Sequence, residues 1–331
     1  MLDHGGNLQA AIRRYGIAAD EWIDLSTGIN PHPYPVPLLA SDAWHRLPEP
    51  SEALLEAARV HYGVSNVLPV AGSQAAIQGL PQLRHRQSGV ANVVVASPSY
   101  AEHAYQWQRA GHAVSAVPYA NLSASIADCD VMVIVNPNNP TGDTVRPEQL
   151  LQWADALAGR GGWLIVDEAF GDVMAELSVA SSVGIPGLIV LRSIGKFFGL
   201  AGLRLGFVAA DEGILDALAD ELGPWGVSGP AQQIGATALA DRRWQSAMQI
   251  TLQSEGQRLQ QMLADLGFQT SGCALFRYWP TSQAAELADF LAQRGIWIRQ
   301  YEHGVRLGLP ADENAWVRLQ TALTEWKEQC K

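Results

Sequence analysis

The stretch LRSIGKFFGLAGLRLGF, residues 191–207, ends an apolar run with Lys196 and places Arg204 eight positions later. Glycines lie between the two cations, and glycine permits sharp turns. A phosphate-binding P-loop would need glycine at position 190 and Ser or Thr at position 197. Val190 and Phe197 occupy those positions, which excludes that motif. Taken alone, a Gly-Lys pair is best interpreted as a solvated lysine at the end of a strand. A different role for the two cations therefore needs evidence from the rest of the chain.

The composition indicates a globular protein with one large or two moderate domains. Of 331 residues, 48% are hydrophobic and 17% are charged, as in ordinary globular chains. The formal net charge of −11 argues against nucleic acid or an anionic membrane as the main partner. Cys129, Cys273 and Cys330 are far apart, which predicts neither a disulfide framework nor a metal site.

The N-terminal residues MLDHGGNLQAAIRR lack the apolar core of a secretory signal. No uninterrupted apolar run reaches the roughly 18 residues that a membrane span needs. From these two features we expect a cytoplasmic chain without a membrane anchor.

Apolar, β-rich runs alternate with helical patterns through the first two thirds of the chain. Runs such as 130–135 (DVMVIV) and 162–167 (GWLIVD) are continuously hydrophobic, which is typical of strands covered on both faces. The pattern therefore predicts an α/β domain with a mainly parallel central sheet flanked by helices.

The character of the chain changes after about residue 225. Two long helical stretches, 230–266 and 283–294, flank short strands around ALFRYW and WIRQY. This combination predicts a smaller α+β domain. The expected division is a large domain over 36–224 and a small domain, with an N-terminal segment, over 1–35 and 225–331.

Short polar motifs follow the predicted strands at the point where each strand ends. They are AGSQ (71–74), SPSY (97–100), NPNNPTG (136–142), DEAF (167–170) and SIGK (193–196). Ligands of parallel α/β sheets gather at the carboxyl ends of the strands. Ordinary alternatives exist, because a Gly-Ser turn can cap a helix and a tyrosine can pack in a core. The proline turns around Asn139 are less ordinary and suit a directed hydrogen bond.

As a set, GSQ, PSY, NPNNPTG, VDEAF, SIGK and R-x-G resemble the motifs of the fold-type I pyridoxal-phosphate enzymes of the aspartate aminotransferase superfamily. They run from Gly72 to Gly206 in the order and comparable spacing of that family. More narrowly, they resemble the branch that contains histidinol-phosphate aminotransferase and threonine-phosphate decarboxylase. The resemblance implies the superfamily's fold, pyridoxal 5′-phosphate as cofactor, and a homodimer with its active site near the subunit interface.

The resemblance also implies a role for each matched residue. Lys196 would form the internal aldimine and later move a proton at the reacting carbon. Asp167 would keep the pyridine nitrogen protonated, so that the ring accepts the electrons left on the substrate carbon. Asn139 would hydrogen-bond the phenolic oxygen, and Tyr100 would stack on the ring. The positions that match the phosphate cradle are Gly72, Ser73, Gln74, Ser193 and Arg204.

HGGN (4–7) and DLSTGINP (24–31) resemble the N-terminal region of the threonine-phosphate decarboxylases of cobalamin biosynthesis. This implies a phosphorylated amino acid as substrate, and two arginines suit a ligand with both a carboxylate and a phosphate. The implied substrate-binding residues are His4, Gly5, the backbone at Gly28, Asn139, Arg299 and Arg306. The alternatives are that His4 is an ordinary terminal residue and that the arginines are strand-edge charges.

Three residues depart from the branch, among them Gly28, where an asparagine often stands, so that any contact there must come from the backbone. Leu47, in HRLPEP (45–50), stands where a tyrosine would reach the partner subunit's cofactor phosphate, and leucine cannot make that hydrogen bond. Phe170 stands where many aminotransferases carry a tyrosine, so more of the contact with the cofactor oxygen would fall to Asn139.

The reaction implied by the resemblance is decarboxylation of O-phospho-L-threonine to (R)-1-amino-2-propanol O-phosphate in cobalamin biosynthesis. An aminotransferase acting on histidinol phosphate or a similar amino acid is an alternative, because it uses the same cofactor and differs only in the bond that breaks. A non-catalytic scaffold that binds the cofactor is a further alternative from a different class. The presence of both Lys196 and Asp167 argues against the scaffold.

Overall fold

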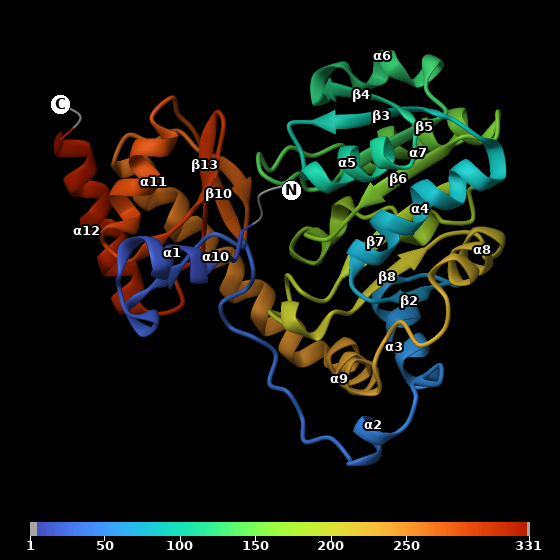
Figure 1. Cartoon of the computed structure of the whole chain (residues 1–331), viewed down its shortest axis with the longest axis horizontal. Helices are drawn as coiled ribbons and strands as arrows, with labels where there is room; N and C mark the ends of the chain where they lie inside the picture. The colour runs from blue at the N-terminus through green and yellow to red at the C-terminus, as the bar shows by residue number, and fades with distance from the viewer. Residues whose placement is uncertain (1–4, 330–331) are drawn as a thin grey trace. The chain divides into compact units, whose positions relative to one another are not determined.

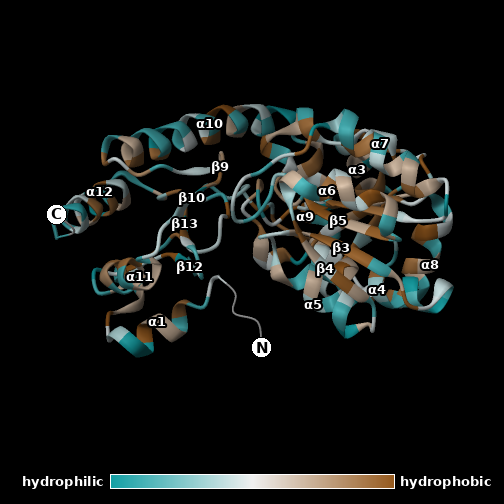
Figure 2. Ribbon diagram, turned by 90° about the horizontal axis from the view of Figure 1, so that it is seen from above, coloured by the Kyte–Doolittle hydropathy of each residue, from teal (hydrophilic) through white to brown (hydrophobic). Residues whose placement is uncertain are grey.

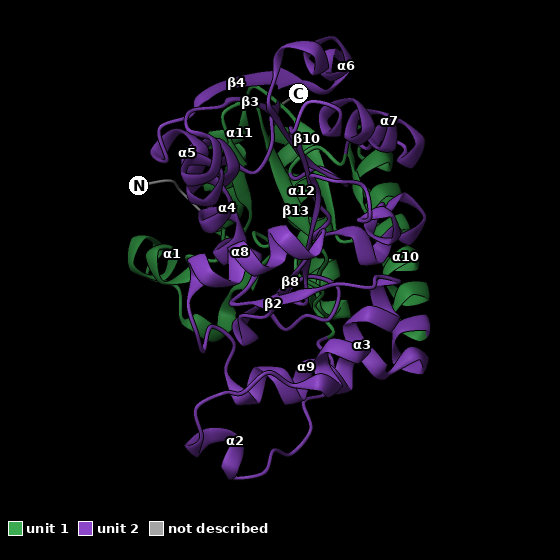
Figure 3. Cartoon of the chain, turned by 90° about the vertical axis from the view of Figure 1, so that its right-hand side faces the viewer, with its two compact units in different colours: residues 1–32, 140–142, 247–331 green, residues 33–139, 143–246 purple. Residues whose placement is uncertain are grey.

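The computed structural model describes residues 5–329, and Figure 1 shows the chain with most of its helices and strands labelled. The chain forms two compact units, coloured separately in Figure 3. Unit 2 contains residues 33–139 and 143–246; unit 1 contains residues up to His32, the segment 140–142, and residues from Ala247 onward. The sequence placed the second boundary at 224/225, whereas the compact unit continues to residue 246.

Unit 2 is built on a seven-stranded sheet with the order β2-β8-β7-β6-β5-β3-β4. The strands are β2 (Leu68–Val70), β3 (Asn92–Ser97), β4 (Ala113–Pro118), β5 (Val131–Val135), β6 (Trp163–Asp167), β7 (Leu188–Ser193) and β8 (Gly206–Ala209). Strands β4, β3, β5, β6 and β7 run parallel to one another, whereas β8 is antiparallel to both β7 and β2. The mainly parallel α/β sheet expected from the sequence is confirmed.

The continuous apolar runs are explained by burial on both faces of the sheet. Every residue of β5, β6 and β7 is buried, although successive side chains of a strand point to opposite faces. Figure 2 shows strands such as β3 and β5 in brown, the apolar end of its scale. Each large aliphatic side chain buried in this way contributes about 1.5–3 kcal/mol.

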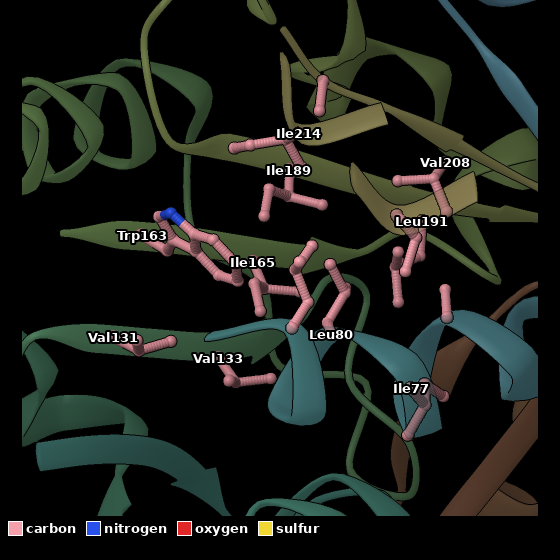
Figure 4. Close-up of a cluster of buried hydrophobic side chains, with 14 of the residues drawn as sticks. Ile77, Leu80, Val131, Val133, Trp163, Ile165, Ile189, Leu191, Val208 and Ile214 are labelled. Carbon is pink, nitrogen blue, oxygen red and sulfur yellow. The ribbon is translucent and has the colours of Figure 1, made fainter. Parts of the chain in front are cut away.

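Helices pack on this sheet and form its core. One cluster joins Ile77 and Leu80 of α4 to strand residues such as Val133 and Ile165 (Figure 4), and α8 adds Ile214 to it. The helices of unit 2 are α2 (Asp42–His45), α3 (Glu52–Tyr62), α4 (Ser73–Ser88), α5 (Ala101–Arg109), α6 (Leu122–Ser125), α7 (Pro147–Ala158), α8 (Glu212–Leu222) and α9 (Gly229–Ala240). Short 3₁₀ turns follow the strands, among them η4 (Gly171–Val173) and η7 (Ala201–Leu203).

Unit 1 has the α+β character predicted for the C-terminal region. Its antiparallel sheet has the order β12-β13-β10-β9, and β1 pairs in parallel with β11. The strands are β1 (Ile23–Asp24), β9 (Ser271–Cys273), β10 (Phe276–Pro280), β11 (Ile296–Trp297), β12 (Arg299–Tyr301) and β13 (Gly304–Gly308). The helices are α1 (Leu8–Tyr15), α11 (Ala284–Ala292) and α12 (Glu313–Gln329), together with most of α10 (Arg242–Asp265).

The helical stretch expected over 230–266 is two helices rather than one. Helix α9 ends at Ala240, and α10 begins at Arg242. Asp241 lies between them outside helical geometry, and its carboxylate accepts a hydrogen bond from the Trp244 N–H at 3.0 Å. Aspartate favours such capping positions because its side chain satisfies an N–H that the helix cannot. No helix within residues 5–329 is long and apolar enough to cross a membrane.

Candidate active site

The topology of unit 2 brings the polar motifs to one edge of its sheet. Because β3, β5, β6 and β7 are parallel, the residues that follow them meet at their shared carboxyl edge. Strand β8 is antiparallel to β7, so Arg204, which precedes β8, reaches the same edge. Strand β2 is antiparallel to β8, and therefore Gly72–Gln74, which follow β2, also begin there.

Asp167 is the last residue of β6 and is almost fully buried, with 3% of its surface exposed. One carboxylate oxygen lies 2.9 Å from Nε2 of His103, and the other accepts the Ala169 N–H at 2.9 Å. His103 belongs to α5 and is also buried. A buried carboxylate needs such partners, and here they hold both of its oxygens. His103 has no sequence signal of its own beyond its position one helical turn after Tyr100.

Lys196 lies three residues after β7 in a half-buried position. Its Nζ is 5.3 Å from the centroid of the Phe170 ring. Phe170 is buried, as are Phe197 and Phe198, which follow the lysine. The amine of Lys196 is therefore held among aromatic side chains at the carboxyl edge of the sheet, where the other polar motifs also lie.

The start of α4 forms an anion cradle with Arg204. Gly72 has a φ of 72°, and a Cβ on it would lie 2.5 Å from an Arg204 guanidinium nitrogen. A Cβ on Gly206 would lie 2.6 Å from the Ser73 backbone nitrogen. Glycine is therefore required at both positions for the guanidinium and the strand to approach the helix. The first N–H groups of a helix have no partner within the helix, which makes this end suited to a phosphate.

Ser193 and Arg204 complete this cradle from the neighbouring strands. Ser193, the last residue of β7, pairs in register with Gly206 of β8 and is buried. Arg204 has a left-handed backbone conformation, with a φ of 53°, and donates from one guanidinium nitrogen to the Ala201 carbonyl at 3.0 Å. A left-handed conformation is uncommon for a side chain of this size. It places a charged, exposed fork beside the helix end.

The side chain of Gln74 is directed to α5 and not to the cradle. Its amide nitrogen donates to the buried Glu102 carboxylate at 2.8 Å, and its amide oxygen lies 3.4 Å from the Tyr100 hydroxyl. Gln106 donates to the same Glu102 oxygen at 2.9 Å. The amide of Gln74 is thus directed at Tyr100, which precedes α5, and at Glu102 within α5. The group that Gln74 can offer to a phosphate is its backbone N–H.

Two asparagines of the NPNNPTG motif hold the loop through their amides. Asn136 binds the backbone of Val145 through both ends of its amide, at 3.1 and 2.9 Å. Asn138 accepts from the Ser99 hydroxyl and donates to the Pro98 carbonyl, both at 2.8 Å. Asn136 thus fixes the loop to its own following residues, and Asn138 holds it against the SPSY motif. Asn139 follows them in a half-buried position.

The two arginines expected to bind substrate lie opposite each other in unit 1. Arg299 of β12 pairs in register with Arg306 of β13, and directly opposed residues of an antiparallel pair share a face of the sheet. Arg306 is 4% exposed and donates to the Ser26 carbonyl at 2.5 Å. Burial is the main cause that lowers the pKa of Arg306, and the neighbouring Arg299 lowers it further. Two cations placed so close are suited to an anionic ligand.

The N-terminal segment of unit 1 also contacts Ser26. The Gly6 N–H donates to the Ser26 hydroxyl at 2.8 Å, and a Cβ on Gly5 would lie 2.6 Å from the Ser26 carbonyl. A cleft of about 420 Å³ is lined in part by Gly5, Ser26 and Arg299. Gly28 is buried and has a φ of 61°. His4 lies outside the described residues.

The chain belongs to the aminotransferase class I and II family, whose sequence model matches residues 22–328. It is 49% identical to a threonine-phosphate decarboxylase of Pseudomonas aeruginosa, over 99% of both chains. It is 41% identical to a threonine-phosphate decarboxylase of Sinorhizobium sp, over 97% of both.

Solved structures share the fold. A histidinol-phosphate aminotransferase of Sinorhizobium meliloti, in complex with pyridoxal-5′-phosphate, superposes with a TM-score of 0.80 at 23% identity, covering 98% of this chain and 95% of that one. An L-threonine-O-3-phosphate decarboxylase of Porphyromonas gingivalis gives 0.78 at 20% identity, covering 92% and 99%. The expected fold type is thereby confirmed.

Proposed function

We propose that the chain is a pyridoxal 5′-phosphate-dependent decarboxylase that converts O-phospho-L-threonine to (R)-1-amino-2-propanol O-phosphate, a step of cobalamin biosynthesis. The observation that carries the choice of substrate is the opposed pair Arg299 and Arg306. A substrate with a carboxylate and a phosphate presents two anions to these two cations. The near full-length identity with threonine-phosphate decarboxylases supports the same choice.

The carboxyl edge of unit 2 fits the cofactor chemically. The cradle at Gly72 and Arg204 suits its phosphate, because a side chain at position 72 would fill the space beside the guanidinium. Lys196 would offer a primary amine for its carbonyl carbon, and the buried Asp167 would offer a carboxylate acceptor for its ring nitrogen. In the same proposal Ser73, Gln74 and Ser193 contribute to the phosphate site, while Tyr100 and Asn139 contact the ring.

When bound, the cofactor withdraws the electron pair that remains on the α-carbon after carbon dioxide leaves. Asp167 keeps a proton on the ring nitrogen, and His103 fixes the orientation of that carboxylate. Lys196 then supplies the proton that replaces the carboxylate on the α-carbon. Arg299 and Arg306 bind the anionic groups of the substrate, together with His4, Gly5, Asn139 and the backbone at Gly28.

We also propose that the chain forms a homodimer in the cytoplasm. Large apolar side chains are exposed along the segment before α3: Leu38 at 104%, Trp44 at 68% and Leu47 at 65%. Such a patch is typical of a surface that is covered by another molecule. Light scattering during size-exclusion chromatography tests the dimer, and Trp44→Ser should shift it toward monomer.

The function is tested by incubating the purified protein and its cofactor with O-phospho-L-threonine, with and without 2-oxoglutarate, and identifying products by mass spectrometry. Decarboxylation predicts loss of carbon dioxide without the keto acid. Loss of the amine only with the keto acid would instead identify an aminotransferase, for which histidinol phosphate is the next substrate. Cofactor binding with no turnover of either amino acid would identify a scaffold.

A further inference from the structure

A buried charged network holds the loop that follows Asp167 in the chain. Arg192, the residue before Ser193 in β7, donates to the Glu168 carboxylate at 2.5 Å and to the Asp172 carboxylate at 2.6 Å. Glu168 follows Asp167 in the chain, and Asp172 lies in the 3₁₀ turn η4. All three side chains of the network are at least nine-tenths buried. One guanidinium therefore connects the end of β7 to both ends of the loop 168–172.

The pKa values of Asp172 and Arg192 are both shifted toward the charged form although the two side chains are buried. Burial acts to raise the pKa of Asp172, but Arg192 and His61 outweigh it, so that this pKa lies below its ordinary value. Burial likewise acts to lower the pKa of Arg192, and the carboxylates of Asp172 and Glu168 outweigh it and raise that pKa. Since the Asp172 carboxylate is ionised, Nε2 of His61, at 3.1 Å, donates to it.

Further contacts hold the loop 168–172 and the Arg192 guanidinium in place. The second Glu168 oxygen accepts the Val179 N–H at 2.8 Å. The guanidinium lies over the Tyr62 ring, 4.5 Å from its centroid. At Gly171, a Cβ would lie 2.6 Å from a guanidinium nitrogen of Arg192, so the loop passes directly against the arginine.

The loop and the strand carry the residues that the proposed function uses. Asp167 precedes the loop, and Phe170 within it contacts the Lys196 amine. On the strand side, Arg192 is followed by Ser193 and, three residues later, by Lys196. A buried ion network is a weak source of stability, because apolar residues of similar volume stabilise a core as well. The planar guanidinium, by contrast, holds one carboxylate on each terminal nitrogen and so defines their relative position.

We propose that Arg192 is a positioning residue, which holds the Asp167 carboxylate and the Lys196 amine in fixed relative placement by clamping the loop 168–172 to the end of β7. The inference rests on the proposed function for the roles of Asp167 and Lys196. It assigns to Arg192 no contact with substrate or cofactor.

Two variants of the full-length protein test this role. Arg192→Lys keeps the charge but cannot bind both carboxylates in the fork geometry. Gly171→Ala retains every charged side chain of the network but displaces the guanidinium. The matched control is Arg84→Lys. Arg84 is another buried arginine of unit 2, which donates to the Gly161 carbonyl at 3.0 Å and lies over Trp163, at the opposite end of β6.

Five quantities are measured for each variant: the unfolding temperature, the dissociation constant of the cofactor by equilibrium dialysis, the visible absorbance of the bound cofactor, kcat and KM. We expect both test variants to lower kcat at least about tenfold with KM changed less than about twofold, since small misplacements of reacting groups have effects of this size. We also expect a shifted absorbance band and weaker cofactor binding. Arg84→Lys should lower only the unfolding temperature.

The inference is overturned if folded Gly171→Ala or Arg192→Lys matches Arg84→Lys, with wild-type kcat, absorbance and cofactor affinity. Should Arg192→Lys fail to fold, Gly171→Ala alone decides. Failure of the proposed function is a separate result: wild-type protein would not decarboxylate O-phospho-L-threonine. In that case the absorbance and cofactor affinity of Gly171→Ala still decide whether Arg192 positions the site.

Discussion

The two ends of the sheet in unit 2 both bury polar side chains, but they pair them differently. At the amino ends of β3 and β6, His112 accepts the Ala91 N–H and lies 2.9 Å from the Pro81 carbonyl, while Arg84 donates to the Gly161 carbonyl. These partners are backbone groups. At the carboxyl ends, Asp167 pairs with the side chain of His103 and Arg192 with two carboxylates.

The difference separates packing from chemistry. A side chain that hydrogen-bonds the backbone groups at the end of a strand stabilises the fold, because its loss leaves a buried donor or acceptor unsatisfied. Side chains that hold other charged side chains fix the direction of a carboxylate or an amine, which is what a reacting group requires. Substitutions at the two ends should therefore change different quantities: activity at the carboxyl end and stability at the amino end.

The largest effect is expected for Lys196→Ala. The variant loses the amine that binds the cofactor and supplies the proton, so kcat should fall by at least about 1,000-fold. The visible absorbance of the bound cofactor should change, whereas circular dichroism and the unfolding temperature should stay close to wild type. Wild-type activity in this variant would contradict the whole assignment of the carboxyl end.

The second-largest effect is expected for Asp167→Asn. An amide cannot keep the ring nitrogen protonated, and removal of one electrostatic partner of a reacting system lowers kcat by about 100-fold.

His103→Gln changes only the partner of that carboxylate and should lower kcat by about tenfold. Steady-state kinetics compare the two, and the interpretation of His103 as a positioning residue is wrong if its substitution is the more damaging one.

Arg306→Met allows a comparison of two buried arginines, Arg306 and Arg84, by the effect of their substitution on KM. Arg306 has Arg299 directly opposite, whereas Arg84 of unit 2 lies over Trp163. Loss of a charged hydrogen bond to substrate, worth about 1.5–3 kcal/mol, should raise KM by roughly 10- to 100-fold. The dissociation constant of the cofactor should not change. Arg84→Met is the control and should leave KM at the wild-type value; equal losses of substrate and cofactor binding in Arg306→Met would refute its role.

The smallest effect is expected at the amino end, for His112→Asn. Burial is the main cause that lowers the pKa of His112 from its ordinary value of 6.5. The unfolded chain therefore binds this proton more readily, so the contribution of His112 to stability is present above pH 6.5 and is lost as the pH falls through the folded pKa.

Urea unfolding at pH 7.5 and pH 5 measures this effect. The wild type should lose stability on acidification. His112→Asn should be less stable at pH 7.5, by on the order of 1 kcal/mol, and should show a smaller change with pH. Its kcat should equal that of the wild type, and a loss of activity would show that the amino end is not confined to packing.

The sequence by itself determined the parts of the molecule that depend on short segments. Continuous apolar runs specify strands buried on both faces, and the polar motifs that end them specify which residues reach the carboxyl edge. The placement of Asp167, Lys196 and Arg204 at one edge follows from strand direction alone. The break at Asp241 was missed because the residues on both sides favour helix and only the capping contact with Trp244 separates them.

Only the tertiary structure decided how those residues are held. His103 and Asp167 are 64 positions apart in the chain, and Arg299 faces Arg306 because of a strand register that neither strand specifies alone. The amide of Gln74 points to Glu102 rather than to the cradle because two helices pack side by side. Local patterns constrain a residue's backbone, but the partner of a buried polar group is chosen by packing between distant segments, where each donor must find the acceptor that the fold leaves within reach.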